Sequence, residues 1–208
     1  MAKNKEATLS EKELEILRQI SVFARSHEDY LELRKGLPPE FQELLDRTRK
    51  LELALERIAQ LVLRIAEEGR QPTSIPISIL AIPNALFSEV AEIYLAILEK
   101  YRPFIEKYVP PVKVDNTEKS IVDAIKEEII NLLTYAPEVI RTITEVGRAA
   151  IAVIVAYKIF IDHFVYGPLE HIKKNYSAII AKEIATQIKD KPGYLRHPAE
   201  ILRREVKK

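Results

Sequence analysis

The clearest regularity in the chain is a seam of apolar residues between positions 41 and 65. Steps of three and four residues alternate along it, with one polar exception, through Phe41, Leu44, Thr48, Leu51, Leu55, Ile58, Val62 and Ile65. This spacing places the residues along one side of an α-helix, in the heptad pattern that packs lengthwise on another helix. The sequence therefore predicts a long helix from Pro38-Pro39 to Glu68-Gly69, with the seam as an interface for assembly.

Helical spacing also covers most of the remaining chain. Ser10 and Glu13 form a capping-box pattern, which predicts a first helix that begins there and continues to Gly36. Beyond residue 83, helices are expected between the proline and glycine residues that mark the junctions. Their expected ranges are 84–101, with Pro103 ending or kinking the helix, then about 115–135, 137–166 and 168–189, and a short basic helix after Pro198.

Residues 70–83 interrupt the helical pattern. This segment carries three prolines in an apolar stretch, and internal prolines oppose a helix, so an extended, buried connector is expected. The predicted fold class is all-α, with no convincing strand outside the connector. It consists of a helical arm (1–69), the connector (70–83), an antiparallel bundle of about four helices (84–190) and a basic C-terminal tail (191–208).

The most apolar helix is expected between Pro137 and Tyr166. Residues 149–156 are all Ala, Val or Ile, so Ile151, Ile154 and Val155 must be covered by other helices, by a second subunit or by lipid. The apolar run is shorter than the roughly 20 residues that span a bilayer, which favours burial over a membrane span. A contact between subunits is the favoured cover.

No motif for catalysis or cofactor binding is found in the sequence. There is no Cys, and the five glycines do not cluster into a phosphate-binding loop. No His follows a Glu by three residues, as a di-iron bundle requires, and the zinc motif His-Glu-x-x-His is absent. Asp162-His163 is the most enzyme-like pair, but neighbouring helix positions point about 100° apart. The expectation is a protein that is not an enzyme, with no cofactor, no metal site and no small-molecule substrate.

Charge is nearly balanced overall, at +1, but basic residues gather in two places. The first group, the basic row, consists of Arg47, Lys50, Arg57 and Arg64 on the seam helix, and the second lies in the tail and includes Arg196, Arg203 and Arg204. Both groups are candidates for binding nucleic-acid phosphates, which Arg can contact through two parallel hydrogen bonds. The alternative is a solvated face on which the row pairs, one helical turn away, with Glu43, Glu52, Glu56 and Glu67.

The layout of the chain resembles the major capsid proteins of filamentous archaeal viruses, particularly the enveloped ones. The resemblance lies in the proline-interrupted helical arm (10–68), the connector (71–83) and the apolar C-terminal bundle, and the Cys-free, Ile-rich composition is compatible with a hyperthermophilic source. It implies a virion protein that forms a helical nucleocapsid, in which homo- or hetero-oligomers of related capsid subunits wrap double-stranded DNA in the A-form. The apolar helix would serve packing or contact a lipid envelope. Recognition would then be of the backbone and the duplex shape.

A different class of function is compatible with the same residues. In this alternative the protein is a cytoplasmic helical adaptor or regulatory subunit, whose seam at 41–65 binds a partner helix. The nearly neutral charge of residues 1–69 also departs from what an arm that wraps DNA requires. Salt-dependent DNA binding separates the two functions, because phosphate contacts weaken steeply with salt and a helix adaptor needs none.

Overall fold

The computed structural model describes residues 9–69, 76–114, 116–142 and 146–175, and it confirms the all-α fold class. In chain order the elements are α1 (Glu11–Ile20), α2 (His27–Lys35), α3 (Pro39–Glu67), the 3-10 helix η2 (Ile77–Leu80), α4 (Ala81–Tyr108), β1 (Val112–Val114), β2 (Thr117–Lys119), α5 (Ile121–Thr142), α6 (Val146–Phe160) and the π-helical turn η3 (Ile161–Tyr166). Helix continues beyond η3 to residue 175. The basic helix expected after Pro198 lies outside the described residues.

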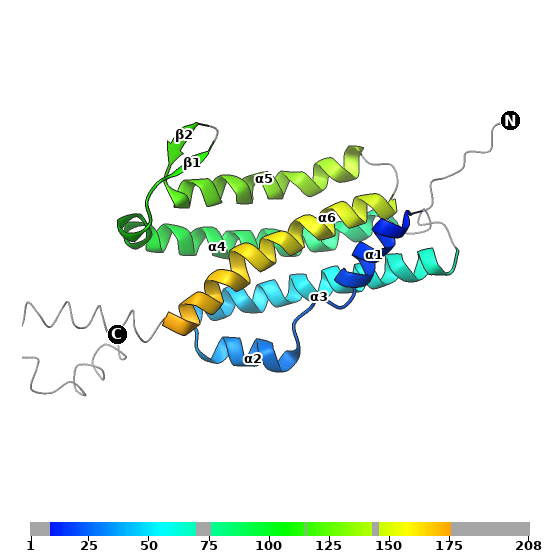
Figure 1. Cartoon of the computed structure of the whole chain (residues 1–208), viewed down its shortest axis with the longest axis horizontal. Helices are drawn as coiled ribbons and strands as arrows, with labels where there is room; N and C mark the ends of the chain where they lie inside the picture. The colour runs from blue at the N-terminus through cyan, green and yellow to red at the C-terminus, as the bar shows by residue number, and fades with distance from the viewer. Residues whose placement is uncertain (1–8, 70–75, 115, 143–145, 176–208) are drawn as a thin grey trace, which may run out of the picture.

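Four long helices form an antiparallel bundle. α3, α4, α5 and α6 run in alternating directions, and α1 lies across α3 and α6 and contacts both (Figure 1). A single cluster of buried apolar side chains extends from Leu17 in α1 to Leu169 beyond η3, so it includes residues on both sides of the segment 70–83. α3 is therefore a helix of the bundle, and the boundary expected at 70–83 does not divide the core.

The apolar seam of α3 is covered by helices of the same chain. An exposed fraction of 7% or less is found at Leu44, Leu51, Leu55, Ile58, Val62 and Ile65. Thr48, the polar exception, is also buried, and its hydroxyl donates to the Leu44 carbonyl at 2.8 Å, which satisfies it inside the helix. Phe41 is half-buried and stacks on Tyr101 of α4, with ring centroids 5.7 Å apart. The seam is thus part of the protein core.

The position of α6 explains why residues 149–156 are apolar on every face. α6 packs against α1, α3 and α5, and aromatic side chains of α4 close another side. Phe87 of α4 stacks on Tyr157 with centroids 4.4 Å apart and meets the edge of Phe160 at 5.1 Å. Ile154 is fully buried and Ile151 is buried, while Val155 is half-buried. Most of the cover that this helix requires comes from its own chain.

The N-terminal part of the chain differs from the prediction in two places. The capping box of Ser10 and Glu13 is present, but the first predicted helix is divided into α1 and α2, because Ser26 caps a new helix after a short loop. The extended connector is the second difference. Residues 77–80 form η2 and α4 begins at Ala81, so this part of the prediction is wrong, while residues 70–75 lie outside the described part.

Prolines end fewer helices than expected. α4 continues through Pro103, and α5 continues through Pro137, which was expected to begin a helix of its own. An internal proline removes one helical hydrogen bond and kinks the helix, but it does not end a helix that packing holds in place on both sides of it.

The helix containing Gly167-Pro168 shows how one such loss is compensated. In the π-helical turn η3, the Gly167 N–H bonds to the carbonyl of Asp162, five residues earlier. Pro168 has no N–H, so the Phe164 carbonyl lacks its helical donor. The Tyr94 hydroxyl of α4 donates to that carbonyl at 2.7 Å, and burial raises the pKa of Tyr94 to about 12, which keeps the donor protonated. A side chain from α4 thus replaces the missing backbone group.

A small β-hairpin precedes α5, where a helix was expected to begin near residue 115. Its strands pair antiparallel, with Val112 opposite Lys119 and Val114 opposite Thr117. Between them Asn116 has a φ of 63°, in the left-handed region that Asn tolerates better than most residues. The polar segment after β1 therefore makes a turn rather than a helix start.

Two helical stretches are long and apolar enough to cross a membrane by length and composition alone. These are Ser78–Lys107 and Gly147–Asn175. In the second, 56% of the most apolar window is buried inside the bundle, compared with 33% in the first. Because the core helix of a bundle passes the same test, this finding is weak evidence for contact with lipid.

Candidate nucleic-acid interface

Three cations of the basic row lie in a line on the outer face of α3. Lys50, Arg57 and Arg64 follow one another at intervals of seven residues, nearly two helical turns, and all three are exposed. The helical repeat places them on the side of α3 away from the buried seam. No hydrogen bond or ion pair joins any of them to another residue in the described ranges. We call these three residues the outer line.

Of the four acidic residues expected to neutralise the row, Glu43 lines the depression beside Arg47, and the other three are engaged elsewhere. Glu52 and Glu56 accept hydrogen bonds from backbone N–H groups of the loop between α1 and α2, at 3.1 Å and 2.9 Å. Glu67 lies 3.8 Å from the guanidinium of Arg18 in α1. Arg57 has no acidic residue three or four positions away on the helix. The pairing of the row with these three glutamates is therefore not found among the described residues.

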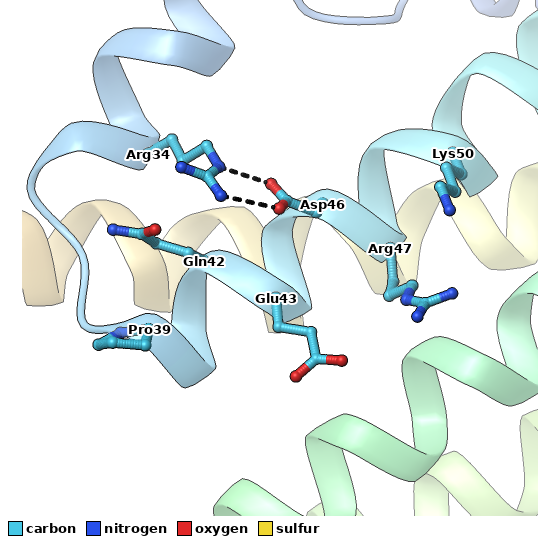
Figure 2. Close-up of a pocket in the computed structure, with 7 residues that line it drawn as sticks. All are labelled: Arg34, Pro39, Gln42, Glu43, Asp46, Arg47 and Lys50. Atoms are coloured by element: carbon cyan, nitrogen blue, oxygen red, sulfur yellow. Dashed lines mark hydrogen bonds and ion pairs between the residues drawn. The ribbon is translucent and has the colours of Figure 1, made fainter.

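Arg47 differs from the other members of the basic row. Its side chain extends toward the neighbouring helix α4 (Figure 2). There its Nη1 lies 2.7 Å from Oε2 of Glu89. The Arg47 side chain is 38% exposed and that of Glu89 is 48% exposed, so the pair lies at the surface and is accessible to water and ions. Among the described residues, the basic row thus consists of three cations without a hydrogen bond or ion pair and one cation that is paired.

An open, polar depression of about 470 Å³ lies at the end of the row nearest α2. Its lining residues are Arg34, Pro39, Gln42, Glu43, Asp46, Arg47 and Lys50 (Figure 2). Arg34 donates two hydrogen bonds to Asp46, at 2.9 Å and 3.1 Å, and the Tyr30 hydroxyl donates a third at 2.6 Å. These bonds, those from Arg34 above all, hold the pKa of Asp46 below its usual value. The negative charge of Asp46 is thus neutralised within the fold.

The most buried polar cluster lies on another side of α3, around Glu52, which is 1% exposed. Its Oε2 accepts from Arg49 at 2.6 Å and from the Tyr166 hydroxyl at 3.0 Å. The Arg25 guanidinium lies 3.9 Å above the centre of the Tyr166 ring and pairs with Glu170 at 2.6 Å. Burial raises the pKa of Tyr166, and the charge of Glu52 raises it further. The cluster joins α3, the α1–α2 loop and the π-helical turn.

The role of Glu52 could have been found in the sequence. Residues seven positions away on a helix lie on nearly the same face. The residues at that distance from Glu52 are Leu45 and Ala59, and both are fully buried. An acidic residue flanked in this way is a buried one, which requires a partner such as Arg49.

The structure also bears on the Asp162-His163 pair, on metal binding and on the basic tail. The Asp162 carboxylate binds Lys158, four residues earlier, so its charge is used within the helix rather than directed at His163. In the described ranges, no group of three or more His, Asp or Glu side chains could hold a metal ion. The tail residues Arg196, Arg203 and Arg204 fall within 176–208, outside the described part of the chain.

Comparison with known proteins does not place the chain in a family. No protein-family model, no curated protein and no solved structure matches it. Its function is therefore inferred from the residues and their geometry.

Proposed function

We propose that the protein is a structural subunit that binds the phosphate backbone of double-stranded DNA through the outer line of α3. The observation that carries the proposal is that Lys50, Arg57 and Arg64 are exposed, aligned and without a hydrogen bond or ion pair to another residue of the described chain. Unpaired cations on a rigid helix are available to release the counterions that surround DNA, which is the main source of non-specific affinity. The helix is packed on the core by its other side, so binding requires no ordering of the chain.

The spacing of the outer line suits a duplex. At 1.5 Å per residue, seven residues correspond to roughly 10 Å along α3, so the line spans roughly 20 Å. Phosphates on one strand advance about 3.4 Å per base pair, so this span covers about six base pairs. Three side chains at this separation can each contact a different phosphate of one duplex. A compact anion is too small to contact all three.

The neighbouring residues favour contact with a backbone rather than with bases. Single-strand binding proteins stack bases on exposed aromatic side chains. In the described residues, the large aromatic side chains that are exposed are Phe104 on α4 and Tyr135 on α5, and neither belongs to α3. Between the cations of the outer line lie Ala54 and Leu61. A duplex bound by charge and shape is therefore the proposed ligand.

In the proposed assembly, many copies coat one DNA molecule as a filament, as the resemblance to filamentous capsid proteins suggests. The duplex in A-form, a partner subunit of related sequence and a place in a virion belong to this proposal. Because the α3 seam is buried within each copy, contacts between copies would use the outer faces of the bundle. The same burial disfavours the adaptor function, which required the seam to be free for a partner helix.

The test is the salt dependence of duplex binding, measured by fluorescence anisotropy between 50 and 200 mM NaCl. Each phosphate contact contributes about 0.9 to the slope of log affinity against log salt, so replacing Lys50, Arg57 and Arg64 together by Gln should reduce the slope by about 2.7. The matched control replaces Lys12, Lys113 and Lys174, which are also exposed, by Gln and has the same change in charge.

The outcomes separate binding by the outer line from general attraction. The control variant should keep the wild-type slope, since its cations lie on other elements. An equal loss of slope in both variants, or no loss in the first, contradicts the proposed interface. Filaments that contain DNA, seen by electron microscopy of wild type mixed with duplex and absent for the outer-line variant, are the expected result for assembly.

A further inference from the structure

Arg47 belongs to the same helix face as the depression but is held by an acidic residue of another helix. It lies three residues before Lys50, so their side chains are neighbours on α3, with Cβ atoms roughly 5–6 Å apart. Its partner Glu89 belongs to α4 and is not among the residues that line the depression. The ion pair therefore holds the end of the Arg47 side chain on the side of α4 (Figure 2).

The two arginines of the depression are not equally available. Arg34 is held by two hydrogen bonds to Asp46, a pair that is further fixed by the Tyr30 hydroxyl. Arg47 has one contact of 2.7 Å to a carboxylate that is itself half exposed. Exposed ion pairs of this kind are weak and exchange readily with other ions. Of the two arginines, Arg47 is the one that a phosphate can recruit.

We infer that Glu89 is an internal counter-charge that competes with a backbone phosphate for Arg47. When Arg47 leaves Glu89, its guanidinium is free to bind a phosphate beside Lys50, and the outer line gains a fourth contact at its α2 end. When Arg47 stays with Glu89, DNA is held by the outer line alone. This inference rests on the proposed function, and it assigns to Glu89 control over the number of phosphates bound.

The experiment compares Glu89→Gln with wild type in the same duplex titrations. Gln keeps the shape of the side chain but releases Arg47, so the salt slope should rise by about 0.9. For three contacts, affinity falls about 40-fold between 50 and 200 mM salt, and for four it falls about 150-fold. Glu92→Gln is the matched control, because Glu92 is an exposed carboxylate on the same helix and removing it changes the net charge equally.

A second variant identifies Arg47 as the group released. Arg47→Gln alone should leave the wild-type slope unchanged, because the paired Arg47 is not used, and adding it to Glu89→Gln should return the slope to the wild-type value. The inference is overturned if wild type binds with the salt slope of about 2.7 expected for three contacts and Glu89→Gln has the same slope. It is also overturned if Glu92→Gln raises the slope as much as Glu89→Gln does. Absence of salt-dependent binding in every variant would overturn the proposed function and this inference together.

Discussion

Replacing Glu52 by Gln tests whether the buried cluster holds the N-terminal helices onto the bundle. In the wild type, Oε1 of Glu52 accepts from the Arg25 backbone N–H, and Oε2 accepts from Arg49 and Tyr166. Gln can retain the first bond through its carbonyl oxygen. Its amide N–H₂ group would then face two donors, and the Arg49 side chain, which is only 14% exposed, would lose its counter-charge.

The cost follows from the burial of the two partners. Breaking a fully buried ion pair by removing one charge costs about 3–5 kcal/mol. Because Arg49 keeps some contact with water, we expect about 2–4 kcal/mol for Glu52→Gln. For a chain of this size each kcal/mol lowers Tm by about 2–4 °C, so the expected decrease is about 4–16 °C. Glu56→Gln can keep the bond from the Ala24 N–H through its amide oxygen and loses only the charge that strengthens it, so it should cost about 1 kcal/mol or less.

Urea unfolding followed by circular dichroism measures both variants. With a slope of about 3 kcal/mol per molar urea, the Glu52→Gln midpoint should decrease by about 1 M. The double variant Arg49→Met, Glu52→Leu removes both charges and should recover part of the loss, since no charge is left unpaired although the Arg25 N–H and the Tyr166 hydroxyl lose their acceptor. A cost below about 1 kcal/mol for Glu52→Gln, or a double variant as unstable as the single one, would refute this explanation of the cluster.

Two further predictions concern stability. The Lys100 hydrogen bond, with a second from Tyr101, lowers the pKa of Glu40 from 4.5 to about 2, so its stabilisation is present above pH 4.5 and is lost as the pH falls toward 2. Because the Glu40 side chain is 28% exposed, we expect about 1 kcal/mol more loss between pH 5 and pH 2 in wild type than in Glu40→Gln, measured by urea unfolding. Leu55→Ala should cost about 2–5 kcal/mol and leave the oligomeric state unchanged in light scattering. Dissociation of an oligomer with little loss of stability would instead show that the seam joins two copies.

The seam illustrates what a periodic pattern can and cannot predict. The repeat through Leu44, Leu51 and Val62 correctly indicated a long helix with one apolar side, because burial of that side is what the pattern records. It could not show whether the covering helices belong to the same chain. A bundle within one chain and an assembly of subunits both require an apolar side on α3. The sequence therefore predicts an interface between subunits at a place where the structure has the protein core.

Prolines were the main source of error in the helix boundaries. Because the local cost of an internal proline is high, the sequence predicts helix starts or stops at Pro137 and Pro168, where the structure has continuous helix. The tertiary structure supplies what local sequence lacks, as the Tyr94 hydroxyl does for the Phe164 carbonyl across 70 residues of sequence. A donor so distant cannot be inferred from residues near the proline.

The candidate interface was predicted in part. Helical spacing correctly placed Lys50, Arg57 and Arg64 on one line, because that placement depends only on the repeat of a single helix. Which cations are neutralised depends on contacts between helices, and the pair of Arg47 with Glu89 joins residues 42 positions apart. From the sequence alone, all four cations of the row are therefore equal candidates for binding phosphate.

The central place of α6 has a consequence for the order in which this fold can be completed during synthesis. This central helix comes late in the chain, and it and the turn after it contact residues from the N-terminal part. Arg148 binds Glu13, 135 residues earlier, and Tyr166 binds Glu52, 114 residues earlier. A nascent chain that ends before residue 146 has made α1, α3 and α4 but lacks the helix that contacts both α1 and α3 from the other side of the core. Until the ribosome has released α6, the apolar sides of the earlier helices stay partly uncovered, which is the condition under which chains aggregate or require a chaperone.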